Sequence, residues 1–195
     1  MVKTGVVHGR FQVLHLKHME YILAAKMRCE KLYIGISNPD TMHTKDSPND
    51  IRRSEKSSNP LTYFERFQMI RGAMAEFGVP ESEYDIIPFP INTPEYILNY
   101  SPKDAVYYLT IYDAWGEEKY KILQELGVTV EVLWRKDVSE KGITSSEIRR
   151  HIALGENWSS LVPKSVYRYL TENGLDQRIA RLERIRIDEK QIELP

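Results

Sequence analysis

The stretch from Val6 to Leu23, VVHGRFQVLHLKHMEYIL, constrains the fold of this chain more than any other. It starts as an apolar strand, passes through a turn that contains Gly9, and then enters a segment of mixed polarity. In that segment apolar residues recur every three or four positions, at Leu16, Met19, Leu23 and Met27. This spacing predicts an amphipathic helix. With the β-favouring runs Val2–Val7 and Leu32–Ile36 on either side, the pattern predicts a βαβ unit with parallel strands.

The start of this predicted helix has the features of a phosphate site. His15 and His18 are three residues apart, so they would share one face of the helix near its N-terminus. A helix N-terminus carries roughly half a positive charge and free N–H groups, and it therefore attracts anions. In the preceding turn, Gly9 would let the backbone approach a ligand closely, and Arg10 could donate two parallel hydrogen bonds to a phosphate.

Composition excludes several classes of protein. The 195 residues are most simply one domain, and 42% hydrophobic and 28% charged residues are ordinary for a soluble globular protein. No apolar run approaches the ~20 residues that span a bilayer, and no secretory signal pattern is present. A single cysteine, Cys29, rules out an intrachain disulfide framework, which fits a cytoplasmic location. We predict that Cys29 packs late in the first helix.

The distribution of charge points to a local anion site. The net charge is −1, which argues against a general nucleic-acid binder. Residues 1–36 nevertheless contain six Lys and Arg against two Glu, and residues 141–170 contain five against two. We therefore expect small-molecule partners, and neither nucleic acid nor a membrane.

Strands alternate with helices along the rest of the chain. The predicted strands are Tyr84–Phe89, Ala105–Ile111 and Val128–Trp134. The predicted helices are Thr62 to about Phe77, which starts with a Thr62–Glu65 capping box, Tyr96–Tyr100, Glu117–Leu126 and Pro163–Leu170. This order predicts the fold class α/β, an open parallel Rossmann-like sheet with helices on both faces. Ligands of such sheets bind beyond the C-terminal ends of the strands.

Two further segments bear on a phosphate ligand. The polar residues 38–60, with three prolines, predict a long loop, and from it Arg52, Arg53 or His43 could reach a bound phosphate. The segment GITSSEIRR, residues 142–150, predicts a second helix start capped by Thr144 or Ser145. Hydroxyl groups, free N–H groups and arginines within one turn suit a polyphosphate. The alternative is an ordinary, well-capped surface helix.

Together these motifs resemble the nucleotidyltransferase superfamily with the HxGH signature, and most closely the archaeal-type nicotinamide-nucleotide adenylyltransferases. GRFQVLHLKH at residues 9–18 is similar to the family's GRxQPxHxGH, and LTYFERFQMI at residues 61–70 to its FTxxERxxMI. ITSSEIRRHI, about 130 residues after the histidines, is similar to its SGTxVRRxM. The resemblance implies a nucleotidyltransferase domain over residues 1–172. It leaves a C-terminal helical tail, residues 173–195, packed on the domain or on a second subunit.

The chain departs from the family pattern at three places. Val13 replaces the usual proline, and Leu16-Lys17 replaces the x-Gly between the histidines. Residues 110–116, TIYDAWG, stand in place of the family's Ser-Gly-Asn-Pro. The resemblance therefore supports ATP chemistry more firmly than it supports one acceptor.

The implied reaction is attack by an acceptor phosphate on the α-phosphorus of ATP, giving pyrophosphate and, with nicotinamide mononucleotide, NAD. The nucleophile is already an anion, so no general base is needed, and catalysis comes from alignment and neutralisation of charge. The implied catalytic residues are His15 and His18, with His18 nearest the α-phosphate, and Arg149 at the β- and γ-phosphates. The implied ATP-binding residues are His8, Gly9, Arg10, Phe11, Gln12, His15, His18, Ile143, Thr144, Ser145, Ser146 and Arg149. Mg²⁺ would bridge the β and γ oxygens as part of the substrate.

The acceptor is less closely defined. Tyr96 lies roughly where the family places its nicotinamide-stacking tryptophan, and the candidate acceptor-binding residues are Asn38, Tyr96, Tyr112, Trp115 and Arg135. Alternative acceptors are pantetheine phosphate, a flavin mononucleotide, or a sugar or alcohol phosphate, with CTP then able to replace ATP. A non-catalytic adenylate sensor is a further alternative. The HxxH spacing also allows zinc, but no second pair of ligands is evident. The resemblance also leads us to expect a homo-oligomer.

Overall fold

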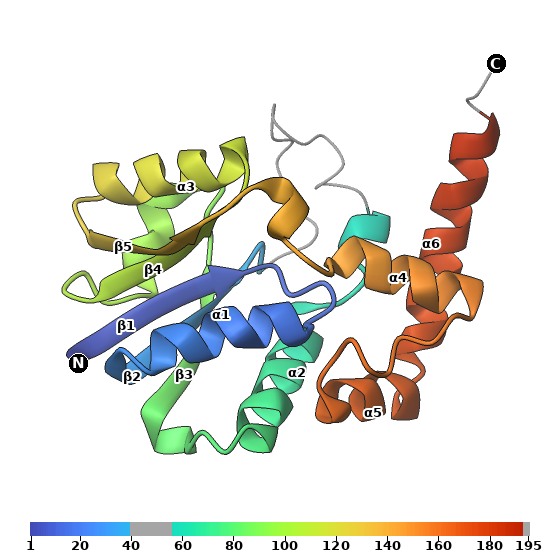
Figure 1. Ribbon diagram of the computed structural model, residues 1–195, viewed down its shortest axis with the longest axis horizontal. Coiled ribbons are helices and arrows are strands. Elements are labelled where there is room, and N and C mark those ends of the chain that lie inside the picture. Colours follow the sequence, from blue (N-terminus) through green and yellow to red (C-terminus); the bar gives the residue numbers. More distant parts are fainter. Residues whose placement is uncertain (40–55, 193–195) are drawn as a thin grey trace.

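The computed structural model describes residues 1–39 and 56–192. At its centre is a five-stranded sheet with the order β3-β2-β1-β4-β5, in which every neighbouring pair is parallel (Figure 1). The strands are β1 Val2–Gly9, β2 Cys29–Ser37, β3 Tyr84–Phe89, β4 Val106–Ile111 and β5 Thr129–Arg135. Helix α1, Leu16–Lys26, connects β1 to its parallel neighbour β2, which confirms the predicted βαβ unit.

Helices cover both faces of the sheet, as predicted. The longer ones are α2 Tyr63–Glu76, α3 Ala114–Glu125, α4 Ser145–Leu154, α5 Lys164–Glu172 and α6 Leu175–Ile192. The short 3₁₀ helices are η3 Lys56–Ser58, η4 Glu81–Glu83, η5 Pro94–Asn99 and η6 Val138–Glu140. Successive strand residues point to opposite faces, so the neighbours Val6 and Val7 belong to different cores. Val7 belongs to the core that also contains residues of α1 and α2, whereas Val6 shares the other core with Leu123 of α3. Figure 1 shows α1 and α2 on one side of the sheet and α3 on the other.

Helix α1 buries a different stripe from the one that the apolar spacing predicts. Its buried residues include Met19, Ile22 and Ala25. Leu16 and Met27, at the two ends of the helix, are 39% and 77% exposed. Cys29 is buried as predicted, but it is the first residue of β2 and not part of the helix.

The predicted helix start at Thr62 is confirmed in detail. Thr62 Oγ1 accepts a hydrogen bond from the Glu65 N–H at 3.2 Å, and a Glu65 carboxylate oxygen accepts one from the Thr62 N–H at 2.8 Å. Gly78, with a φ of +72°, follows the end of the helix. Of the residues in the polar segment that could reach a phosphate, His43, Arg52 and Arg53 lie outside the described part of the chain.

The C-terminal helix packs on the domain itself. Leu175 and Ile179 of α6 are buried in the core beneath α4 and α5, and Arg184 Nε donates a hydrogen bond to the Ala153 carbonyl of α4 at 2.8 Å. Figure 1 shows α6 crossing α4, with α5 near the end at which α6 begins. Glu183 of α6 is completely buried. Within residues 1–39 and 56–192, no helix combines the length and the apolar character that a bilayer crossing requires.

Candidate active site

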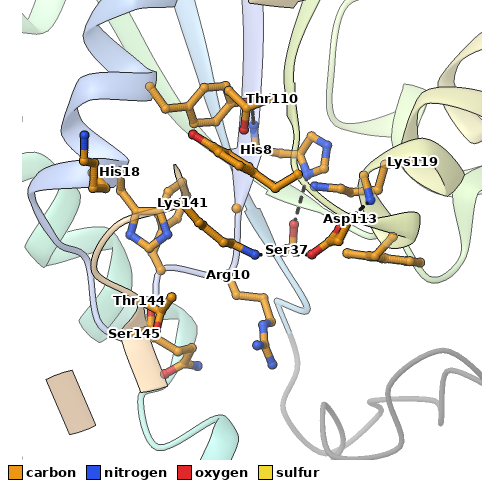
Figure 2. A pocket seen from close by; sticks show the side chains of 18 of the residues that line it. His8, Arg10, His18, Ser37, Thr110, Asp113, Lys119, Lys141, Thr144 and Ser145 are labelled. Atoms are coloured by element: carbon orange, nitrogen blue, oxygen red, sulfur yellow. Dashed lines mark hydrogen bonds and ion pairs between the residues drawn. The ribbon is translucent and has the colours of Figure 1, made fainter. Parts of the chain in front are cut away.

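A cavity of about 470 Å³ opens at the C-terminal edge of the sheet, where open parallel sheets bind their ligands. The ends of β1, β2 and β4 and the starts of α1 and α4 surround it (Figure 2). The predicted nucleotide-binding residues that line it are His8, Gly9, Arg10, Phe11, Gln12, His15, His18, Ile143, Thr144, Ser145 and Ser146. Motifs about 130 residues apart in the sequence therefore meet at one cavity.

The turn between β1 and α1 is held by its own side chains. A Cβ atom on Gly9 would lie 2.8 Å from the ring of Phe11, so the missing side chain makes room for this ring. Gly9 also lines the cavity, and close approach of its backbone to a ligand stays a prediction. The Gln12 amide donates to the Leu61 carbonyl at 2.8 Å and accepts from the Leu61 N–H at 2.9 Å. These two bonds tie the turn to the segment that precedes α2.

His15 and His18 cap the helix that carries them. His15 is the N-cap of α1, and its Nδ1 accepts a hydrogen bond from the His18 N–H at 3.3 Å. In return, His18 Nδ1 accepts one from the His15 N–H, also at 3.3 Å. The two rings stack with centroids 3.6 Å apart. Because both Nδ1 atoms accept, each neutral ring carries its proton on Nε2, and each can donate that N–H to an anion.

The environment keeps both histidines uncharged in the ligand-free cavity. Burial, and secondarily the positive charge of Lys141, lowers the pKa of His15 to about 3. Burial also lowers the pKa of His18 well below its ordinary value, with further contributions from His15, Arg10 and Lys141. The imidazoles therefore act as hydrogen-bond donors at neutral pH, and positive charge comes from the lysine and arginine side chains.

Helix α4 begins at the same cavity. Thr144 is its N-cap, with Thr144 Oγ1 accepting from the Glu147 N–H at 3.3 Å and Glu147 accepting from the Thr144 N–H at 2.8 Å. Ser145 Oγ donates to the Val13 carbonyl at 2.9 Å, which joins this helix start to the turn before α1. The cavity thus receives the N–H ends of two helices, and their dipoles favour a polyanion between them.

Arg149 does not line the cavity, contrary to the prediction that it grips the β- and γ-phosphates. Its side chain is only 3% exposed, and its Nε lies 3.7 Å from the carboxylate of Glu183. Its guanidinium donates hydrogen bonds to the Gln12 carbonyl and, at 3.1 Å, to Ser146 Oγ. The buried carboxylate of α6 draws the guanidinium behind the cavity wall, where it connects α4, α6 and the turn before α1.

Arg66 is a second buried arginine, and it holds the strand ends together. It is 0% exposed and donates to the carbonyls of Arg10 at 3.1 Å, Ser37 at 2.7 Å and Asn38 at 2.7 Å. Burial lowers its pKa to about 10, so it remains charged at neutral pH. It belongs to the ERFQMI motif, but only the folded chain shows which carbonyls it supports.

The predicted acceptor residues divide into two groups. Asn38, Tyr112 and Trp115 line the cavity, and Tyr112 accepts a hydrogen bond from Trp134 Nε1 at 2.6 Å. Tyr96 does not line it, because η5 turns this side chain outward and leaves it 51% exposed. Arg135 is also absent from the cavity wall, since it pairs at the surface with Glu117. The structure therefore does not bring Tyr96 and Arg135 to the cavity wall, and their role at the acceptor stays a prediction.

Several cavity residues were not predicted as ligands. Lys119 of α3 and Lys141, before α4, join Arg10 and Lys17 as cations of the wall, and Asp113 is the one carboxylate among its described residues. Lys141 lies in the second basic stretch of the sequence, and this stretch could have identified it as a ligand. Nothing in the local sequence pattern indicated that Lys119 lies at the site. An excess of positive charge in a concave, partly buried site concentrates anions there.

Asp113 organises one side of this cationic wall. It is the N-cap of α3 and accepts from the Gly116 N–H at 2.9 Å. Lys141 Nζ lies 3.3 Å from its other carboxylate oxygen. Burial raises the pKa of Asp113, but the Gly116 N–H and the charge of Lys141 outweigh burial, so this pKa lies below its ordinary value.

Comparisons with known proteins fit this geometry. The sequence profile of a family described as cytidylyltransferase-like matches residues 6–151. The chain is 45% identical over 176 residues to a phosphonoformate cytidylyltransferase of Streptomyces viridochromogenes, across 90% of this chain and 95% of the relative. It is 33% identical over 183 residues to a nicotinamide-nucleotide adenylyltransferase of Saccharolobus solfataricus, across 91% and 95%.

A solved structure supports the fold. A bifunctional NMN adenylyltransferase/ADP ribose pyrophosphatase from Francisella tularensis superposes with a TM-score of 0.72 at 18% identity. The match covers 100% of this chain and 56% of that one, so this chain spans little more than half of the longer protein. At this level of identity the likeness shows the fold alone, and it confirms the predicted Rossmann-like architecture.

Proposed function

Because this chain belongs to the cytidylyltransferase-like family and is a nucleotidyltransferase, we propose that it transfers CMP from CTP to a small phosphonate or phosphate acid. An oxygen of the acceptor attacks the α-phosphorus of CTP, the bond between that phosphorus and the oxygen bridging to the β-phosphate breaks, and pyrophosphate leaves. The observation that carries the proposal is the cavity itself, where two helix N-termini and an excess of cationic side chains surround one space.

In this proposal the chain's residues align and neutralise phosphates. The acceptor is an anion at neutral pH, so no side chain has to remove a proton from it. His15 and His18 donate from Nε2 to oxygens near the α-phosphate, and the first N–H groups of α4 hold the β- and γ-phosphates. Mg²⁺ enters with the triphosphate as part of the substrate. Among the described residues, no cluster of three or more His, Cys, Asp or Glu is placed to hold a metal ion.

A small, strongly charged acceptor suits the rest of the cavity. Lys119 and Lys141 supply positive charge on the side formed by α3. Tyr96, the candidate platform for a nicotinamide ring, is exposed and is not among the residues that line the cavity. The relative at 45% identity is named for a compact acid that combines a phosphonate and a carboxylate, and this chemistry matches a wall rich in cations.

Adenylyl transfer from ATP to nicotinamide mononucleotide is the second candidate. It is supported by the 33% identity with an archaeal enzyme of that name. The rings of Tyr112 and Trp115 also lie at the cavity, where one of them could stack on a flat acceptor.

An assay of pyrophosphate release distinguishes these functions. The full chain is incubated with Mg²⁺, with CTP or ATP, and with phosphonoformate, methylphosphonate, nicotinamide mononucleotide or pantetheine phosphate. We expect release with CTP and a small phosphonate, and product identity is checked by ³¹P NMR. Release only with ATP and nicotinamide mononucleotide would replace the first proposal by the second. Tight nucleotide binding without release from any acceptor would instead indicate a sensor.

A further inference from the structure

The side of the cavity formed by β1 and α3 contains a buried histidine whose Nε2 atom has no hydrogen-bond partner among the described residues. His8 is 5% exposed and lines the cavity. Its ring stacks on Phe89 with centroids 4.3 Å apart and an interplanar angle of 8°. Nδ1 lies 3.3 Å from Ser37 Oγ, whereas Nε2 has no hydrogen-bond partner among the described residues. A buried polar atom without a partner is costly, so such an atom at a cavity wall indicates a ligand group.

The charges around His8 indicate the sign of that ligand. Burial lowers the pKa of His8, and the positive charge of Lys119 lowers it further. Lys119 and Lys141 also act on Asp113, which is already engaged with Gly116 and Lys141. An anionic oxygen at this point would meet positive charge, and it would receive the His8 Nε2 hydrogen when Ser37 donates to Nδ1.

This subsite is separate from the histidine pair that faces the nucleotide. His15 and His18 stand at the start of α1. Figure 2 shows His8 and Lys119 on the side of α3, away from His18. Lys141 lies between the two groups, because its charge acts on His15 and His18 while its Nζ contacts Asp113. A single short acceptor could therefore place one acid group near His8 and Lys119 and the other near the histidine pair.

On the basis of the proposed nucleotidyl transfer, we propose that His8 and Lys119 bind a second, non-reacting acid group of the acceptor, a carboxylate. The reacting phosphonate or phosphate oxygen then lies toward Lys141 and the histidine pair. The substrate class is a compact acid with two acidic ends, and the carboxylate end determines specificity.

The test compares two acceptors that differ by the carboxylate. Phosphonoformate has this group and methylphosphonate lacks it. With CTP and Mg²⁺ present, we expect the wild-type KM for phosphonoformate to be about 10- to 100-fold lower than the KM for methylphosphonate. The reason is that hydrogen bonds to a charged group are worth about 1.5–3 kcal/mol. His8→Gln and Lys119→Gln should each bring the two KM values together, mainly by raising the KM for phosphonoformate. Lys121→Gln, an exposed lysine of the same helix outside the cavity, should keep the wild-type ratio.

A binding measurement separates this proposal from the proposed reaction. Calorimetric titration of both acids into each variant gives the ratio of Kd values without turnover. A ratio that collapses in His8→Gln and Lys119→Gln but not in Lys121→Gln supports the subsite, even if no pyrophosphate is released. If wild type binds both acids equally or binds neither, or if Lys121→Gln lowers the ratio as much as the other two variants, the subsite is overturned. Circular dichroism checks that each variant is folded.

Discussion

Replacing His18 by alanine is expected to lower kcat by about 10²–10³, the usual effect of removing one donor that stabilises transition-state charge. The capping geometry places the proton of this neutral ring on Nε2, which leaves it free to donate to the transferred phosphate. Stability should fall by only about 1 kcal/mol, because the substitution removes one hydrogen bond of the cap. Steady-state kinetics and thermal unfolding of the same preparation measure both effects.

Two further variants separate catalysis from capping. His18→Gln introduces glutamine, a residue that is common at this position of a capping box. Helix α1 should therefore start normally while turnover still falls. His151→Ala removes a histidine of α4 that pairs with Glu156 outside the cavity, and its kcat should equal that of wild type. Full turnover in both His18 variants would remove this residue from the mechanism.

Replacing Glu183 by alanine is expected to destabilise the fold by about 3–5 kcal/mol, because it leaves buried Arg149 without its counter-charge and also removes the carboxylate that binds Arg186. Typical domains are stable by only about 5–15 kcal/mol, so the loss should be evident in urea unfolding. Burial lowers the pKa of Arg149, and the negative charge of the Glu183 carboxylate opposes that shift.

The control is an exposed carboxylate of the same helix. Asp188→Ala should change the free energy of unfolding by less than about 0.5 kcal/mol. Arg149→Ala should also be destabilising, whereas an arginine that only binds phosphate would lose activity with little change in stability. Equal unfolding free energies for wild type and Glu183→Ala would show that the buried pair does not hold α6 on the domain.

Local patterns in the sequence identified the parts of the site that depend on near neighbours. The caps of Thr62 with Glu65 and of Thr144 with Glu147 were predictable because both partners lie within one turn. The histidine pair was identified for the same reason, although its use as the cap of α1 was not. Alternation of strands and helices predicted the sheet, and the carboxyl ends of parallel strands then predicted the position of the cavity.

Local sequence patterns could not predict the roles of side chains whose partners lie far away in the sequence. Arg149 was assigned to the phosphates from the family motif alone, and its buried partner Glu183 lies in a tail that the motif does not cover. The direction of Tyr96 depends on how η5 packs Ile97 into the core. Lys119 became part of the cavity only through the placement of α3 beside β4. The predicted likeness to nicotinamide-nucleotide adenylyltransferases is confirmed, and a cytidylyltransferase relative shares a higher identity.

Two helix starts that bind one triphosphate are the central feature of the proposed site, and an NMR titration tests this directly. ¹⁵N-labelled protein is titrated with CTP and Mg²⁺, and backbone amide shifts are followed for Lys17 and His18 of α1 and for Ser145 and Ser146 of α4. We predict that all four amides shift with one common midpoint concentration. Shifts confined to one helix start, or two different midpoints, would contradict a shared site.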